Sequence, residues 1–293
     1  MDGPPCWGDL AFSRRAGKEY QVPVEEPSFG AVADALVELT WDFRRTLLWF
    51  RSSIMNWSEY VESRYEAEAM RLLMLIWRQV RAVTDLAQQA PDNFAPAPIL
   101  ARAAFEGGLT CNWLLQGEDA KVCEGRWLVL QYEAAQRMRR VSRQLHEAGI
   151  PSDRWRQEAV RLENLTSEKG VEGRTRRPNV LEMLRSLGLE RLYFGYILAS
   201  QWSHGTILAG REHAAEQRTP FSLGEWYTPF NMSIWGILFG ARGYLQRPGG
   251  PGLKRLQGTP LGDAQDTLQV LLAAWEAEGA TAGEESGAEY HES

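Results

Sequence analysis

The chain has 293 residues, 44% of them hydrophobic, so it can bury a substantial core and is too apolar for a disordered protein. Its formal net charge of −6 excludes a generally basic nucleic-acid binder. The charge is uneven, however, because residues 126–177 hold 12 Lys and Arg against 7 Asp and Glu, a net of +5 that leaves −11 elsewhere. This basic stretch is either a surface that faces an anion or a solvated helix face.

Neither the cysteines nor the N-terminus points to an oxidising compartment or a membrane. The three cysteines are odd in number and lack zinc-type spacing. Met1 is followed by no basic and apolar leader, and no apolar run reaches the roughly 18 residues that would span a bilayer. We therefore expect a cytoplasmic protein without a membrane segment. The chain contains no phosphate-binding loop or other cofactor motif, so no cofactor is expected.

The first part of the chain predicts an irregular arm and three helices. Residues 1–27 are rich in Pro, Gly and charge and form the arm. Amphipathic helices are expected over 28–50 and 58–90, with Ser58 at the start of the second. The third, over 99–116, is unusually rich in Ala and Gly. The glycines among them cost helix propensity, a cost that is explained where another helix approaches closely.

The rest of the chain predicts further helices separated by Gly and Pro stops. We expect helices over 119–149, 152–169, 179–187, 190–213, 230–245 and 263–278, a basic loop over 170–178 and a disordered acidic tail over 279–293. No stretch alternates as a strand would. The fold is therefore predicted to be all-α, an irregular antiparallel bundle of about eight to ten helices. Residues 28–278 are expected to form one domain.

Two predicted helices carry polar residues at intervals of four. Arg102 and Glu106 lie in a mostly apolar helix, where an unpaired charge would be costly, so each needs the other or a partner from another helix. They form either a structural ion pair or a guanidinium that Glu106 holds toward an anion or substrate. Tyr196, Ser200 and His204 have the same spacing and share one face of the later helix. We expect the two helices to face each other.

His204 is the residue on that face with the side chain best suited to proton transfer near neutrality. It is either a general base or phosphate contact, or a satisfied core histidine. Ser203 precedes it, but a Ser–His pair on one helix lacks the nucleophile turn of a hydrolase. Arg211 and His213 follow, and the nine-residue separation of the two histidines does not suit metal binding, so no metal site is expected.

A further arginine and histidine lie in the basic stretch, where Arg140 precedes His146 by six positions. This spacing resembles the motif of the HEPN superfamily, which consists of all-α proteins, many of them metal-independent ribonucleases that act as dimers. The resemblance implies RNA as a partner and a homodimer. The residue after the arginine is Val141, where the motif usually has a polar residue. That departure favours the alternative interpretation, a solvated basic face.

Two short motifs carry a second resemblance: Leu100-x-Arg102-x3-Glu106 and Tyr196-x3-Ser200-x3-His204. With these motifs, residues 99–213 resemble a family of bacterial helical proteins of unknown function. The resemblance implies that the five polar residues belong together, and it implies no established activity.

Two functions are consistent with these residues. In the first, the protein is an RNA- or nucleotide-directed effector. Arg102, Glu106 and His204 would then be catalytic, and four more residues would bind the ligand: Tyr196, Ser200, Ser203 and Arg211. A sensor of a small anionic ligand would use the same pocket without turnover. In the second, the protein is a non-catalytic interaction or regulatory protein, and the same residues form a buried structural network.

Overall fold

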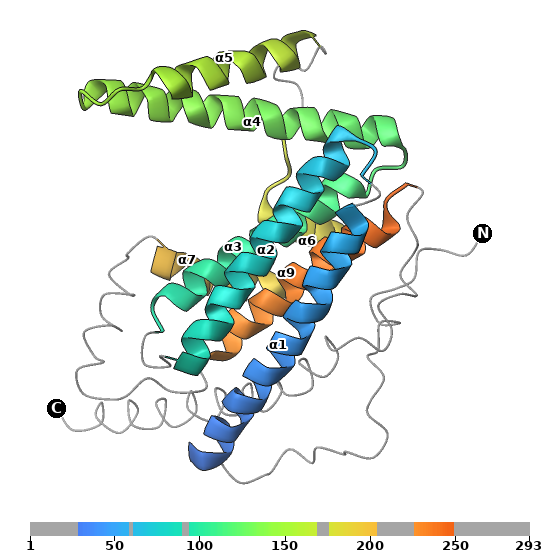
Figure 1. Cartoon of the computed structure of the whole chain (residues 1–293), viewed down its shortest axis with the longest axis vertical. Coiled ribbons are helices and arrows are strands. Elements are labelled where there is room, and N and C mark those ends of the chain that lie inside the picture. Colours follow the sequence, from blue (N-terminus) through green and yellow to red (C-terminus); the bar gives the residue numbers. More distant parts are fainter. Residues whose placement is uncertain (1–28, 59–60, 90–93, 169–175, 204–225, 249–293) are drawn as a thin grey trace, which may run out of the picture.

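The structure is a computed structural model that describes residues 29–58, 61–89, 94–168, 176–203 and 226–248. Within these ranges all regular structure is helical and no strand occurs, which confirms the all-α prediction (Figure 1). The elements are α1 (Phe29–Ser58), α2 (Arg64–Gln89), α3 (Pro96–Leu115), α4 (Ala120–Glu147), α5 (Asp153–Glu168), α6 (Val180–Ser186), the 3₁₀ helix η2 (Glu190–Leu192), α7 (Tyr193–Ser203) and α9 (Tyr227–Gln246).

Helix α3 occupies the centre of the bundle. It packs against α2 on one side and α9 on another, while α1 covers α2 and the shorter α6 and α7 contact α3 (Figure 1). The core contains large side chains from helices far apart in the chain, among them Phe50, Leu73, Phe105 and Phe239. The bundle therefore places α3 where its polar residues can be reached by several neighbours.

Close packing of α3 against α9 explains the small residues of α3. A Cβ added at Gly108 would come within 2.2 Å of the Gly236 carbonyl oxygen, and one added at Gly236 within 2.7 Å of the Ala104 oxygen. The two backbones are therefore in direct contact. Sequence alone indicated a close neighbour for this helix, and the structure identifies it as α9.

Local capping signals set several helix starts. Asp119 caps α4 by accepting the Val122 amide at 2.8 Å, and Asn179 caps α6 in a reciprocal capping box with Glu182. The predicted start at Ser58 is wrong, because Ser58 is the last residue of α1. The cap of α2 is Ser63, whose side-chain oxygen accepts the Glu66 amide at 3.2 Å.

Helices α4 and α5 form a hairpin over residues 120–168 that lies across one end of the bundle in Figure 1. Gly149 makes the turn with a φ of 72°, a left-handed conformation that glycine adopts without strain. The N-terminal part of α4 joins the main core through Cys123 and Trp127. Beyond it, the hairpin buries a small apolar seam of its own: Val129, Ala135, Ala159 and Leu162.

Several predictions fall outside the described residues. These are the arm over 1–27, part of the basic loop, the continuation of α7 over 204–213, the helix over 263–278 and the tail over 279–293. Among the helices that the structure does describe, none is long and apolar enough to cross a membrane.

Candidate functional site

The predicted contact between Arg102 and the Tyr196 face is present. Arg102 of α3 donates from Nε to Glu106 Oε1 at 2.9 Å and from Nη2 to the Tyr196 hydroxyl at 3.1 Å. Its guanidinium carbon lies 4.9 Å from the centre of the Tyr196 ring. The ion pair with Glu106 and the contact with Tyr196 therefore join α3 to α7, as the spacing of the two motifs predicted.

These three side chains form a closed cluster. Tyr196 is also hydrogen-bonded to Glu106, and burial followed by this bond raises the pKa of the Tyr196 hydroxyl above its ordinary value. Side-chain exposure is 18% for Arg102 and 36% for Glu106, so the cluster is reached by solvent at one edge. The carboxylate balances the charge of the guanidinium. Within the described part of the chain, Arg102 Nη1 has no hydrogen-bond partner.

The structure does not bring the other predicted site residues into the Arg102 cluster, or does not describe them. The Ser200 hydroxyl donates to the carbonyl of Tyr196 in its own helix at 2.8 Å, so its proton is not directed at Arg102 or Glu106. Ser203 is the last residue of α7. His204 and Arg211 lie outside the described residues, and their roles stay predictions.

A second polar group on α3 was not predicted. Thr110, one turn beyond Glu106, donates to the Glu106 carbonyl and accepts from Arg177 Nη1, both at 2.8 Å. Arg177 also lies 3.4 Å from the Glu133 carboxylate of α4. Thr110 continues the four-residue spacing of Arg102 and Glu106, and this spacing could have identified it. The partner Arg177 follows no local pattern and could not have been predicted.

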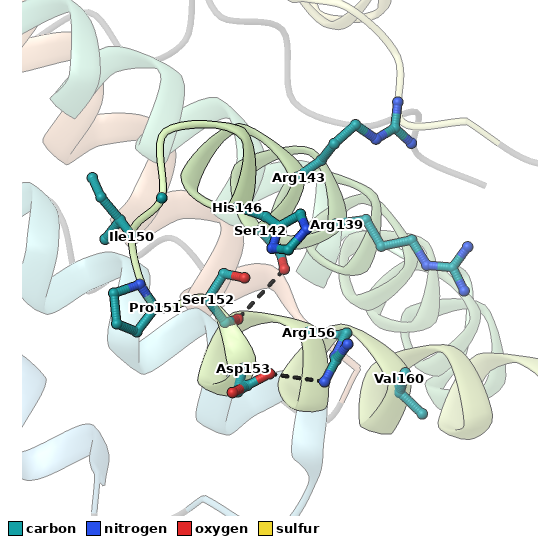
Figure 2. A pocket seen from close by; sticks show the side chains of 11 residues that line it. Arg139, Ser142, Arg143, His146, Ile150, Pro151, Ser152, Asp153, Arg156 and Val160 are labelled. Carbon is teal, nitrogen blue, oxygen red and sulfur yellow. Dashed lines mark hydrogen bonds and ion pairs between the residues drawn. The ribbon is translucent and has the colours of Figure 1, made fainter.

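The hairpin contains an open groove of about 840 Å³ between α4 and α5. Figure 2 shows Ser142 of α4 bonded to the Ser152 carbonyl across the groove, with Arg139 and Arg143 extending from α4. The groove is lined by Arg139, Ser142, Arg143, His146, Gly149, Ile150, Pro151, Ser152, Asp153, Arg156 and Val160.

The arginines of the hairpin divide into paired and unpaired groups. Arg139 pairs with Glu163, Arg156 with Asp153, and Arg161 with Glu158. In contrast, an exposed row on α4 has no ion-pair or hydrogen-bond partner among the described residues. The row consists of Arg137, Arg140, Arg143 and His146. These residues follow one another at intervals of three, so consecutive members are neighbours on the helix surface.

Within the described ranges, no three His, Cys, Asp or Glu side chains are grouped as metal ligands. The two described cysteines, Cys111 and Cys123, are buried thiols. Burial raises the pKa of both thiols, which keeps them protonated and unreactive.

Comparison with known proteins identifies a family. A family of unknown function, DUF5677, matches residues 67–219, a range that includes α3, the hairpin and α7. The match contains both motifs of the candidate site. No curated protein and no solved structure matches the chain.

Proposed function

The chain belongs to the DUF5677 family, whose function is unknown, and we propose that it is an RNA-directed effector that holds RNA on the α4–α5 hairpin. The observation that carries this proposal is the unpaired row of Arg137, Arg140, Arg143 and His146. An arginine already paired with an acid gains little from a phosphate, whereas an unpaired one gains a charge-assisted hydrogen bond.

The charge distribution supports RNA rather than a small anion as the main ligand of the hairpin. Each step of three residues turns about 60° around α4, so the row winds around the helix instead of converging on one point, and this suits an extended phosphate backbone. The rest of the chain is acidic and would repel a polyanion, so contact would be confined to the basic stretch.

In this proposal the Arg102 cluster lies beside the reacting group. Arg102 Nη1 would contact a phosphate, Glu106 would hold the guanidinium in place, and Tyr196 would orient α7. His204, which lies outside the described residues, would act as acid or base. The HEPN-like interpretation of Arg140 and His146, with its homodimer, also stays a prediction. Both side chains are exposed on α4, and His146 lines the groove.

A second candidate function has its own supporting observation. Arg102, Glu106 and Tyr196 satisfy one another, as expected of a structural network that fixes α7 on α3 in a non-catalytic interaction protein. The two candidates predict different results when these residues are changed.

The first experiment measures binding of a short single-stranded RNA to the full chain by fluorescence anisotropy over a range of salt concentrations. The triple variant Arg137→Gln, Arg140→Gln, Arg143→Gln should bind at least about tenfold more weakly. Its salt dependence should be shallower, because each lost phosphate contact removes roughly 0.7 from the slope of log K against log salt. The matched control, Arg156→Gln with Arg161→Gln, removes arginines paired with acids on α5. If the control loses as much affinity, or the wild type does not bind, the proposal is wrong.

The second experiment incubates the protein with total RNA without metal and compares the wild type with Arg102→Ala and His204→Ala. If the protein is an RNA-directed effector, the wild type should cleave RNA and neither variant should. If the wild type leaves the RNA intact and Arg102→Ala only lowers the melting temperature, the structural network is the correct interpretation.

A further inference from the structure

Helix α1, on the outside of the bundle in Figure 1, exposes a row of large apolar side chains. Val37, Trp41, Leu48 and Met55 are each between 56% and 64% exposed. Their spacing keeps them within about 40° of one another around the helix, over a length of about 27 Å. Single exposed apolar residues are ordinary on a protein surface, whereas a continuous row marks a surface that another segment covers. We call these four residues the α1 stripe.

Arginines flank the α1 stripe on the side that faces α2. Arg44 lies 4.0 Å from Asp85 of α2, and the guanidinium carbon of Arg51 lies 5.5 Å from the centre of the Trp77 ring of α2. Arg51 is exposed and has no acidic partner among the described residues. The exposed Glu38 lies at the opposite end of the stripe. A partner with carboxylates beside its apolar residues would therefore cover the stripe and pair with Arg51.

The helix that the sequence predicts over 263–278 has the composition that this surface needs, and it lies outside the described residues. Four of its apolar residues recur at the three- and four-residue spacing of one helix face: Leu268, Leu271, Leu272 and Trp275. Residues 263–293 contain eight Asp and Glu and no Lys or Arg. A helix over 263–278 would be about 24 Å long, which is close to the length of the stripe.

The described chain ends near the α1 stripe. Arg247, the residue after α9, pairs with Glu66 in the first turn of α2. Five residues separate Ser58, the end of α1, from Arg64, the start of α2, so α9 and α1 end at the same end of the bundle (Figure 1). The chain from residue 248 to residue 263 extends up to about 50 Å. This exceeds the length of the stripe, so the segment over 263–278 can reach the stripe in either direction.

We propose that the segment over 263–278 docks on the α1 stripe as an amphipathic helix, with its apolar face on the stripe and its carboxylates near Arg51. Two other occupants fit less well. The arm over 1–27 has no helical apolar spacing and contains basic as well as acidic residues. A second copy of the chain would bring the arginines beside its own stripe against Arg44 and Arg51, and like charges repel. The inference does not depend on RNA binding, because α1 and the hairpin share no residue.

The first test places the photo-crosslinker p-benzoylphenylalanine at Leu48 of the full chain and identifies the attached peptide by mass spectrometry. Attachment within residues 263–278 of the same chain is expected. A mixture of isotope-labelled and unlabelled chains separates this result from attachment to a second copy. The matched control carries the crosslinker at Trp155, an exposed apolar residue of α5, and should not attach to 263–278.

The second test measures deuterium exchange of the full chain. Leu48→Asp with Met55→Asp should make the amides of 263–278 exchange at least about tenfold faster, because a short helix without a packing partner is marginal in water. The control Trp155→Asp should leave this exchange unchanged, and circular dichroism verifies that each variant is folded. Attachment of the crosslinker to residues 1–28 or to a second copy overturns the proposal. Exchange of 263–278 that is as fast in the wild type as in the double variant also overturns it.

Discussion

Glu66 and Arg247 form a nearly buried ion pair between the start of α2 and the residue that follows α9. Arg247 Nε lies 2.7 Å from Glu66 Oε1, and the two side chains are 10% and 9% exposed. The other carboxylate oxygen accepts the backbone amides of Glu62 and Ser63 at 3.0 Å. Burial alone would raise the pKa of Glu66. The hydrogen bonds from Arg247 and the two amides outweigh it, and the pKa lies below the ordinary 4.5.

We therefore predict that Glu66→Gln lowers the free energy of unfolding at neutral pH by roughly 3–5 kcal/mol, because it leaves Arg247 buried without its counter-charge. Urea unfolding measures the change. The matched control is Glu68→Gln, which removes the partner of the exposed Arg71 and should cost no more than about 1 kcal/mol.

The same pair sets a pH dependence with a defined sign. Because the folded state lowers the pKa of Glu66, it binds fewer protons than the unfolded state, so the stabilisation is present above pH 4.5 and is lost as the pH falls through the lowered folded value. The stability difference between wild type and Glu66→Gln should therefore shrink below pH 4.5. A difference that stays constant down to the acid transition would contradict this assignment.

Among the helices, the contact between α3 and α9 depends on glycine at the crossing. We predict that Gly236→Ala destabilises the protein by about 1–3 kcal/mol or more, because its methyl would meet backbone atoms that cannot turn away. The matched control is Gly125→Ala in α4, where an added Cβ meets nothing within 4 Å. It should stabilise by about 0.5–1 kcal/mol through helix propensity. Thermal unfolding of both variants tests the pair of predictions. If Gly236→Ala and Gly125→Ala changed the stability equally, the α3 and α9 backbones would not be in contact.

At the scale of the whole molecule, the bundle and the hairpin differ in the size of their apolar interiors. The bundle core includes Phe105, Phe230 and Phe239, whereas the far part of the hairpin buries two alanines with Val129 and Leu162. We predict that the backbone amides of α5 exchange with deuterium at least about tenfold faster than those of α3 and α9, since exchange follows the free energy of local opening. Mass spectrometry of peptic fragments measures this. Equal protection would show that the hairpin opens only with the bundle.

Two parts of the candidate site differ in how far the sequence could predict them. Arg102 with Glu106 was predictable because residues four apart on a helix are neighbours whatever the helix packs against. Their contact with Tyr196 was predictable because charges in an apolar helix need polar partners, and Tyr196 lies on the polar face of another apolar helix. The unpaired row on the hairpin was not predictable, because the sequence shows the charges but not which arginines have acidic partners. Arg139 and Glu163, for example, form an ion pair only because the hairpin turn brings α5 back against α4.

The sequence by itself determined the all-α class and most helix ranges, because hydrophobic periodicity acts over a few residues. Only the tertiary structure decided which helix meets the small residues of α3, where Glu66 finds its partner, and which apolar residues of α1 are left exposed. Glu66 and Arg247 are 181 positions apart, and no local pattern relates them. Such contacts are selected by how whole helices fit together, because close packing and charge burial depend on side chains that the fold alone brings into contact.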